Sequence, residues 1–564
     1  MTDVEVSLPQ PEHPGEVPAP SKIVGIRHYQ YLLFVLTFVV FFGIYSSLSV
    51  AIVPMTGTTS TDADAPKHVD WTNPDTVLSA FFWAYFIPHS TGAKLTQLIG
   101  AKWLLLTTMF IGSVFNIVIP AMSDVFGSSG VIACRVAQGL CQGFLYPCIN
   151  SLVNVWTPAC ERTRVLNLIY GCAPLGTAIC MPLAGLLAGS ETGWPLVFST
   201  MGGAGIVWAI IFAFFSEHSP STHSRISEEE KQYIEQSSIR VPAQNMTRAP
   251  PTPWVAIVKS VPVWAILMAG SAHCWGQHTM LTQIPSYMHN FMNYDITKDG
   301  EVSSLPYVAQ LGVSLIAIPI TDIIISKKIT STTTKRKIFN SLGCFIPAVF
   351  LLALAFIDRS ERISAVALLV VAVGTSVFAQ SGYVVNATDL APNHAAVMLS
   401  LVSSYTTIYS VLGPLTVGFL GRDKTDPTLW RDVFLISASI YTACGIFYCV
   451  FASTEKQPWN EVDPEELGTA AKMKQFCQKW WLRWKNQVKS YWNSTKRRLG
   501  CSTGSYNFEN SWLCKPRNYF ENSCLCKRRY VGCPSFCSCG SYNFENSLKK
   551  IDCSSFCSPL CSIM

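Results

Sequence analysis

Charged side chains are scarce in this chain. Only 13% of its 564 residues are Asp, Glu, Lys or Arg, whereas 49% are hydrophobic. This composition excludes an ordinary soluble multidomain protein, in which about a quarter of the residues are charged. Twelve apolar runs have the length, about 20 residues, that crosses a bilayer as a helix; they are 30–53, 76–98, 103–121, 131–152, 166–188, 194–216, 261–287, 303–326, 338–357, 363–386, 396–420 and 432–452. We therefore predict an all-α, multi-pass integral membrane protein with twelve transmembrane helices.

The predicted spans fall into two groups. Their longest break, at 217–260, follows the sixth span and separates two six-helix halves, 27–216 and 261–452. We interpret the break as a cytosolic middle loop.

Both ends of the chain are expected on the cytosolic side. Residues 1–26 are rich in Pro and acidic residues and lack the charged-then-apolar order of a cleavable signal, which favours a disordered arm. Placing this arm in the cytosol also puts Arg162, Arg164 and the basic cluster at 327–337 in cytosolic loops, as the positive-inside rule expects.

The tail, 453–564, lacks histidine and has no pair of cysteines at C-x2-C spacing, so no zinc site is predicted there. A cytosolic location argues against a disulfide framework for its many cysteines.

Residues 469–500 carry nine Lys or Arg and no acid, with apolar residues at helical spacing. This pattern favours a basic amphipathic helix on anionic lipid, with a calmodulin-like partner as the alternative.

The last four residues, from Cys561 to Met564, match the C-a-a-X pattern for farnesylation. Cys561 is therefore a candidate lipidation site and could serve a prenyl-dependent partner, although so short a motif also arises by chance.

Elsewhere the histidines and carboxylates form no nucleophile or metal constellation. The sequence thus predicts no enzymatic centre, cofactor, metal site or nucleic-acid partner.

One predicted span carries a cation. In "RVAQGLCQGFLYPCIN", at 135–150, helical geometry places Arg135, Gln138 and Gln142 in one sector of about 120°. An Arg near the bilayer centre costs roughly 2.5 to 3.5 kcal/mol even on the lenient insertion scale, so this face should look into the bundle or a watery cavity. Alternatively, Arg135 reaches the headgroups and the two amides only join neighbouring helices.

A central cation in a cavity attracts anions, and bundles with two six-helix halves place solute sites at the midplane between the halves. Other polar side chains could converge there, or could simply bond to their own helices. The candidates are Tyr45, His89, His273, Gln277, His278, Gln380, Ser381 and Asn386. We expect His273 to be the ionisable group of the second half that faces Arg135.

Several stretches carry a family resemblance. They include "FFWAY" at 81–85, "RVAQGLCQGFLYP" at 135–147, "LPYVA" at 305–309, "SGYVVNATDLAP" at 381–392 and "FASTEKQPW" at 451–459. In order and spacing they resemble the anion:cation symporter branch of the major facilitator superfamily. That branch includes sialin, the vesicular glutamate transporters and the sodium-phosphate cotransporters. The resemblance implies a twelve-helix bundle that alternates access and moves acidic solutes.

The resemblance also implies site residues, with departures. Arg135 matches a substrate-facing arginine and Tyr85 the usual tyrosine of span 2, whereas Tyr45 and His273 stand where relatives have arginines. Gln142 stands where an acidic coupling residue is usual and Gln138 where some members have a second acid. Because an amide has no proton to exchange, proton coupling through span 4 should be absent.

The stretch at 321–337, which covers the end of span 8 and the loop before span 9, resembles a charge-relay latch. Its Asp322, together with Arg162 and Arg164 in the first half, is a candidate gating group, although simple positive-inside charge explains the same residues.

The sequence therefore predicts a secondary transporter of small anions, either inorganic phosphate or an acidic organic solute, in the plasma membrane or an endolysosomal or vesicle membrane. Sodium is a possible co-transported ion. The alternative is a transport-silent relative that acts as a receptor or scaffold through its tail.

Overall fold

The structure is a computed structural model. It describes residues 25–56, 74–158, 161–223, 225–239, 252–326, 331–421 and 423–460. Most of the predicted arm, the basic helix at 469–500 and Cys561 lie outside these ranges.

The first half consists of α1 (Ile26–Thr56), α2 (Pro74–Ile99), α3 (Ala101–Gln142), α4 (Leu145–Trp156), α5 (Arg162–Gly171), α6 (Ala173–Ala188) and α7 (Pro195–Phe215). Helix α3 contains two passages, because the backbone leaves the helical conformation at Gly127, with φ of 61° and ψ of −143°. Glycine adopts this positive φ without steric cost. The second passage continues into α4, and α5 and α6 together form the fifth.

The second half consists of α10 (Val261–Ser286), the short helix η3 (Tyr287–Phe291), α11 (Ile296–Ser326), α12 (Thr332–Leu354), α13 (Arg362–Ser376), α14 (Phe378–Leu390), η4 (Pro392–His394), α15 (Ala395–Leu420), α16 (Pro427–Phe451) and η5 (Pro458–Asn460). With α13 and α14 counted as one passage, each half crosses the bundle six times. This confirms the predicted all-α fold of twelve spans.

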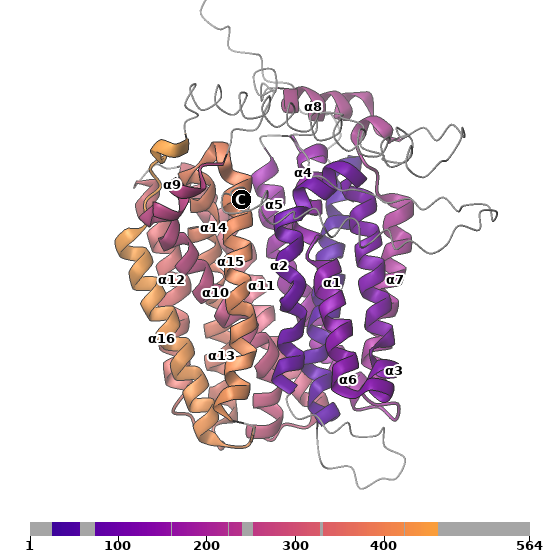
Figure 1. The fold of residues 1–564 in the computed structure, drawn as a ribbon, viewed down its shortest axis with the longest axis vertical. Coiled ribbons are helices and arrows are strands. Elements are labelled where there is room, and N and C mark those ends of the chain that lie inside the picture. The colour runs from indigo at the N-terminus through magenta and orange to yellow at the C-terminus, as the bar shows by residue number, and fades with distance from the viewer. Residues whose placement is uncertain are drawn as a thin grey trace, which may run out of the picture. The chain divides into compact units, whose positions relative to one another are not determined.

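The middle loop holds η1 (Pro220–Thr222), α8 (Glu228–Ile239) and α9 (Trp254–Lys259). Helix α8 lies at the end of the bundle where α1 begins, at the top of Figure 1. There the Glu230 carboxylate accepts the backbone N–H groups of Ile26 and Arg27, at 3.0 and 3.1 Å. These bonds satisfy two donors that the first turn of a helix otherwise leaves unpaired. We call this end of the bundle proximal and the opposite end, where α1 ends and α2 begins, distal.

Not all spans are equally apolar. Among the described residues, eight helical stretches have the length and hydropathy to cross a membrane, and α2, α10 and α11 are not among them. These more polar helices lie where the two halves meet: α2 packs on α15, α10 on α1, and α11 on α6. Helices that face protein rather than lipid can carry polar side chains.

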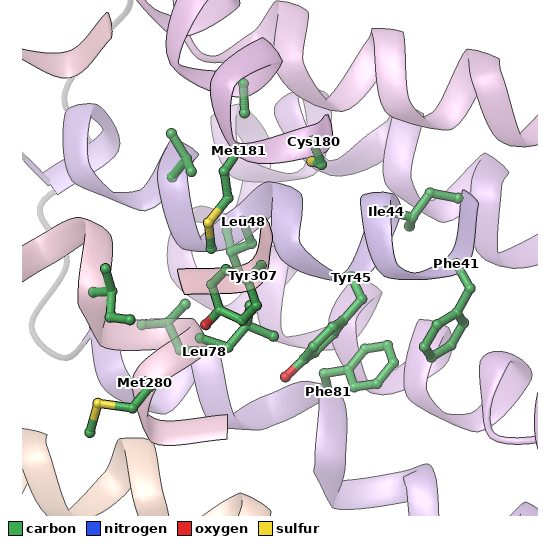
Figure 2. Packing of buried hydrophobic residues seen from close by; sticks show 14 of the residues in the cluster. Phe41, Ile44, Tyr45, Leu48, Leu78, Phe81, Cys180, Met181, Met280 and Tyr307 are labelled. Atoms are coloured by element: carbon green, nitrogen blue, oxygen red, sulfur yellow. The ribbon is translucent and has the colours of Figure 1, made fainter. Parts of the chain in front are cut away.

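The halves approach closely through small residues. A Cβ on Gly300 of α11 would lie 2.9 Å from the Cα of Gly185 of α6, so the two backbones touch there. Buried apolar side chains from both halves form one continuous cluster. Figure 2 shows part of this cluster, with Tyr45 of α1, Phe81 of α2 and Tyr307 of α11 among its members.

Candidate functional site

Arg135 lies inside the bundle, on the second passage of α3, with only 2% of its surface exposed. One terminal nitrogen donates to the Gln138 side-chain oxygen at 3.0 Å, and the other donates to the backbone carbonyl of Tyr45 at 3.2 Å. The guanidinium carbon lies 5.0 Å from the centre of the Phe81 ring, a cation–π distance. All of these contacts are neutral, and Nε has no hydrogen-bond partner in the described part of the chain.

A glycine makes this arrangement possible. Any Cβ at Gly139, one helical turn after Arg135, would overlap the backbone carbonyl oxygen of Phe81. Helix α3 therefore approaches α2 so closely that only a bare backbone fits between them. This contact brings the Phe81 ring against the guanidinium.

The two span-4 glutamines play different structural parts. Gln138 links Arg135 to the third span: its amide nitrogen donates to the Asn116 side chain at 3.1 Å and to the Gly112 carbonyl at 3.3 Å. Gln142 is also buried and packs against Gly112, but neither of its amide atoms has a hydrogen-bond partner among the described residues. Gln138 thus joins neighbouring helices, as the alternative interpretation of the sequence expects, while Gln142 keeps free hydrogen-bonding capacity.

Aromatic rings connect Arg135 to the second half. The Tyr45 ring centre lies 6.0 Å from the guanidinium carbon and 6.2 Å from the ring centre of His278 on α10. His278 also contacts Phe82, with ring centres 4.6 Å apart. Tyr85 continues the row along α2, with its ring centre 5.4 Å from that of Phe81. The Tyr45 ring therefore lies beside the Arg135 guanidinium, Tyr85 reaches it only through Phe81, and His278 is the α10 histidine that contacts the first half.

His273, about one and a half turns earlier on α10, turns instead into its own half. Its Nε2 lies 3.0 Å from the Gln380 amide nitrogen, and its ring faces Tyr383. Asn386 donates to the Tyr448 hydroxyl on α16 at 2.9 Å. The described contacts thus place these two predicted site residues in the second half, among α10, α14 and α16, and do not join them to Arg135.

The predicted proximal gate is only partly described. Arg162 donates a hydrogen bond to the Asn154 carbonyl at 3.1 Å, and Arg164 also takes part in a polar or ring contact. Asp322 belongs to α11, but its side chain lies outside the described part of the structure. The described proximal ion pairs each stay within one half or its flanking loop: Arg27–Glu161, Lys102–Glu217, Lys231–Glu228 and Arg336–Asp389.

At the distal end, by contrast, a polar contact crosses between the halves. Asp75, at the start of α2, accepts from the Lys424 ammonium at 2.8 Å and from the Gln283 amide at 2.9 Å. Both donors belong to the second half. The Asp75 side chain is 4% exposed and the Lys424 side chain 14%, so this ion pair is shielded from solvent. No sequence pattern indicates the pair, since 349 residues separate the two partners.

The described residues contain no group of three or more His, Cys, Asp or Glu side chains that could hold a metal ion. What the site offers is a buried guanidinium, buried amides, phenol hydroxyls and aromatic rings. These groups can bind an anionic or polar solute, and they include no nucleophile paired with a base.

Comparison with known proteins identifies the family and the fold of the chain. The profile of the Major Facilitator Superfamily matches residues 33–414. A Drosophila melanogaster protein named "Putative inorganic phosphate cotransporter" is 36% identical over 394 residues, covering 69% of this chain and 74% of that protein. Human vesicular glutamate transporter 2 is 34% identical over 442 residues, covering 76% of this chain and 74% of the transporter.

Solved structures share the fold at low identity. A D-xylose–proton symporter superposes with a TM-score of 0.58 at 11% identity, covering 76% of this chain and 99% of its own. A bacterial homolog of the human lysosomal transporter Spinster, in an inward-facing conformation, gives a TM-score of 0.55 at 12% identity and covers 78% of this chain and 99% of its own.

Proposed function

Because this chain belongs to the major facilitator superfamily, in the branch of the inorganic phosphate cotransporters and vesicular glutamate transporters, we propose that it carries small anions across a membrane by alternating access. The solute we propose is inorganic phosphate or an acidic organic molecule, the solutes named for these relatives.

The observation that carries the proposal is that the Arg135 guanidinium is buried without a counter-charge among the described residues. The guanidinium is 2% exposed, and in the described part of the chain it forms no ion pair. A buried charge without a counter-charge is expensive, and an opposite charge nearby removes much of that cost. An anion bound beside Arg135 would supply the missing charge.

The coupling mechanism follows from the neighbouring amides. Gln138 and Gln142 occupy the face of α3 that Arg135 shares, and neither titrates at accessible pH. We therefore propose that no proton is exchanged through this helix and that sodium or the membrane potential drives transport. The proximal end is proposed to face the cytosol, with the host membrane being the plasma membrane or an endolysosomal or vesicle membrane.

Uptake into proteoliposomes tests the proposal. The full chain is reconstituted, and uptake of inorganic phosphate and of L-glutamate is measured with and without a sodium gradient and a voltage step. We expect saturable uptake of at least one solute, which Arg135→Ala abolishes. The matched control is Arg431→Ala, because that side chain is 48% exposed and its pair with Asp432 is a surface contact of little energy.

The scaffold alternative predicts a different outcome. A correctly folded wild-type protein would then carry neither solute, and deletion of 461–564 would displace a binding partner instead. Flux that Arg135→Ala leaves unchanged would also contradict the proposed role of the guanidinium.

A further inference from the structure

Two phenol hydroxyls at the centre of the bundle have no hydrogen-bond partner among the described residues. Tyr45 of α1 is 3% exposed and Tyr307 of α11 is fully buried, yet neither hydroxyl oxygen bonds to any described group. Leaving a buried polar group unpaired costs about 1–3 kcal/mol. A protein usually avoids this cost unless a solute or a water completes the bonds.

The two tyrosines come from opposite halves and lie in one packed cluster. Figure 2 shows them together with Leu48, Leu78 and Met280. A solute that accepts from both hydroxyls would therefore bridge the halves.

Tyr45 also contacts the buried cation, Arg135. Its backbone carbonyl accepts from Arg135 at 3.2 Å, and its ring lies beside the guanidinium. The other buried Lys and Arg side chains of the described residues lie within the first five residues of their helices: Arg27, Lys102, Lys335 and Arg336. Within this central cluster Arg135 thus supplies positive charge, and the phenols can supply neutral donors.

We propose that Tyr45 and Tyr307 bind the oxyanion group of the solute, a carboxylate or a phosphate, with one hydroxyl donated from each half and Arg135 balancing the charge. This inference rests on the proposed function and adds Tyr307 to the site. Hydroxyl donors to an anionic oxygen form short, strong hydrogen bonds. In the alternating access proposed above, rocking of the halves would move the two donors apart, so the solute would be held fully only while the halves are close.

Tyr45→Phe and Tyr307→Phe test the inference, since each removes the hydroxyl and keeps the ring in the packed cluster. Tyr287→Phe is the matched control: Tyr287 is 1% exposed, its hydroxyl also lacks a partner among the described residues, and its ring packs on Trp430 and Phe434. KM and kcat for inorganic phosphate and for L-glutamate are measured in proteoliposomes of the full chain, together with equilibrium binding of both solutes to the purified protein.

We expect each test variant to raise KM and Kd by about tenfold to hundredfold, the loss of one hydrogen bond to a charged group. The solute that shows this change identifies the oxyanion as phosphate or carboxylate, and the control should stay within about twofold of wild type. If Arg135→Ala abolishes uptake while Tyr307→Phe leaves KM and Kd unchanged, the inference is wrong and the proposed function stands. A wild-type protein that neither binds nor carries either solute contradicts both.

Discussion

The distal Asp75–Lys424 pair should control how readily the bundle opens at that end. Because Asp75 belongs to the first half and Lys424 to the second, any state in which the halves separate distally must break the pair. Replacing Lys424 by Ala removes one partner and strands a carboxylate that is 4% exposed.

The expected size of the effect follows from the burial of the pair. Removing one partner from a buried ion pair costs about 3–5 kcal/mol. The Gln283 amide remains bonded to the other carboxylate oxygen at 2.9 Å, so we take the lower end, about 3 kcal/mol. This cost falls on the distally closed state alone, since Asp75 is hydrated once the halves part. At about 1.4 kcal/mol per factor of ten, the closed-to-open equilibrium should shift roughly 100-fold toward the open state.

Hydrogen exchange of the full chain in lipid nanodiscs measures this shift. In Lys424→Ala we expect the backbone amides at the start of α2 and in η3 to exchange on the order of 100-fold faster, while amides in the core of α7 keep their rates. The double variant Asp75→Asn with Lys424→Ala, which no longer strands a charge, should recover much of the protection. Unchanged exchange at both distal segments in Lys424→Ala would refute the reasoning.

Three further predictions concern other contacts. In Gly139→Ala the new Cβ would overlap a backbone oxygen of α2, so the thermal midpoint should fall by the equivalent of about 1–3 kcal/mol or more. Gly203→Ala is the control, because a Cβ there meets nothing within 4 Å and the midpoint should not change. Equal midpoints for the two variants would contradict the close approach of the helices. Gln142→Glu should create uptake that responds to an imposed pH gradient at constant voltage, whereas wild-type uptake should ignore it; pH-driven wild-type uptake would show that coupling lies elsewhere. Glu230→Gln should cost about 1–2 kcal/mol of stability by weakening the bonds to the start of α1, while Glu228→Gln, on the exposed face of α8, should be neutral in the same melting assay.

The fold could be predicted because membrane solvation leaves few options. A run of about 20 apolar residues in lipid must be a helix, so such runs locate most of the spans, while α2, α10 and α11 are more polar than the rest. The predicted 194–216 and 396–420 correspond to α7 (Pro195–Phe215) and α15 (Ala395–Leu420). The burial of Arg135 follows from the same solvation argument, applied to a charge.

The details of the site could not be predicted, because they depend on how each helix is rotated and on contacts between the halves. His273 and His278 are five residues apart, so they point about 140° from one another. Hydropathy could not decide which of them faces the first half. Asp75 and Lys424 lie at span ends, where a charged residue looks like an ordinary loop residue. Tyr307 looks like an apolar ring of its span until its hydroxyl is seen to lack a partner among the described residues.

Binding of the solute to purified protein tests most directly whether the buried guanidinium attracts the anion. Equilibrium binding of inorganic phosphate and of L-glutamate is measured for wild type, Arg135→Lys and Arg135→Ala, each shown to be folded by its melting curve. The account predicts saturable binding to wild type, weaker binding to Arg135→Lys, which keeps the charge but loses the planar donor fork, and none to Arg135→Ala. Equal affinity of wild type and Arg135→Ala for the same anion would contradict it.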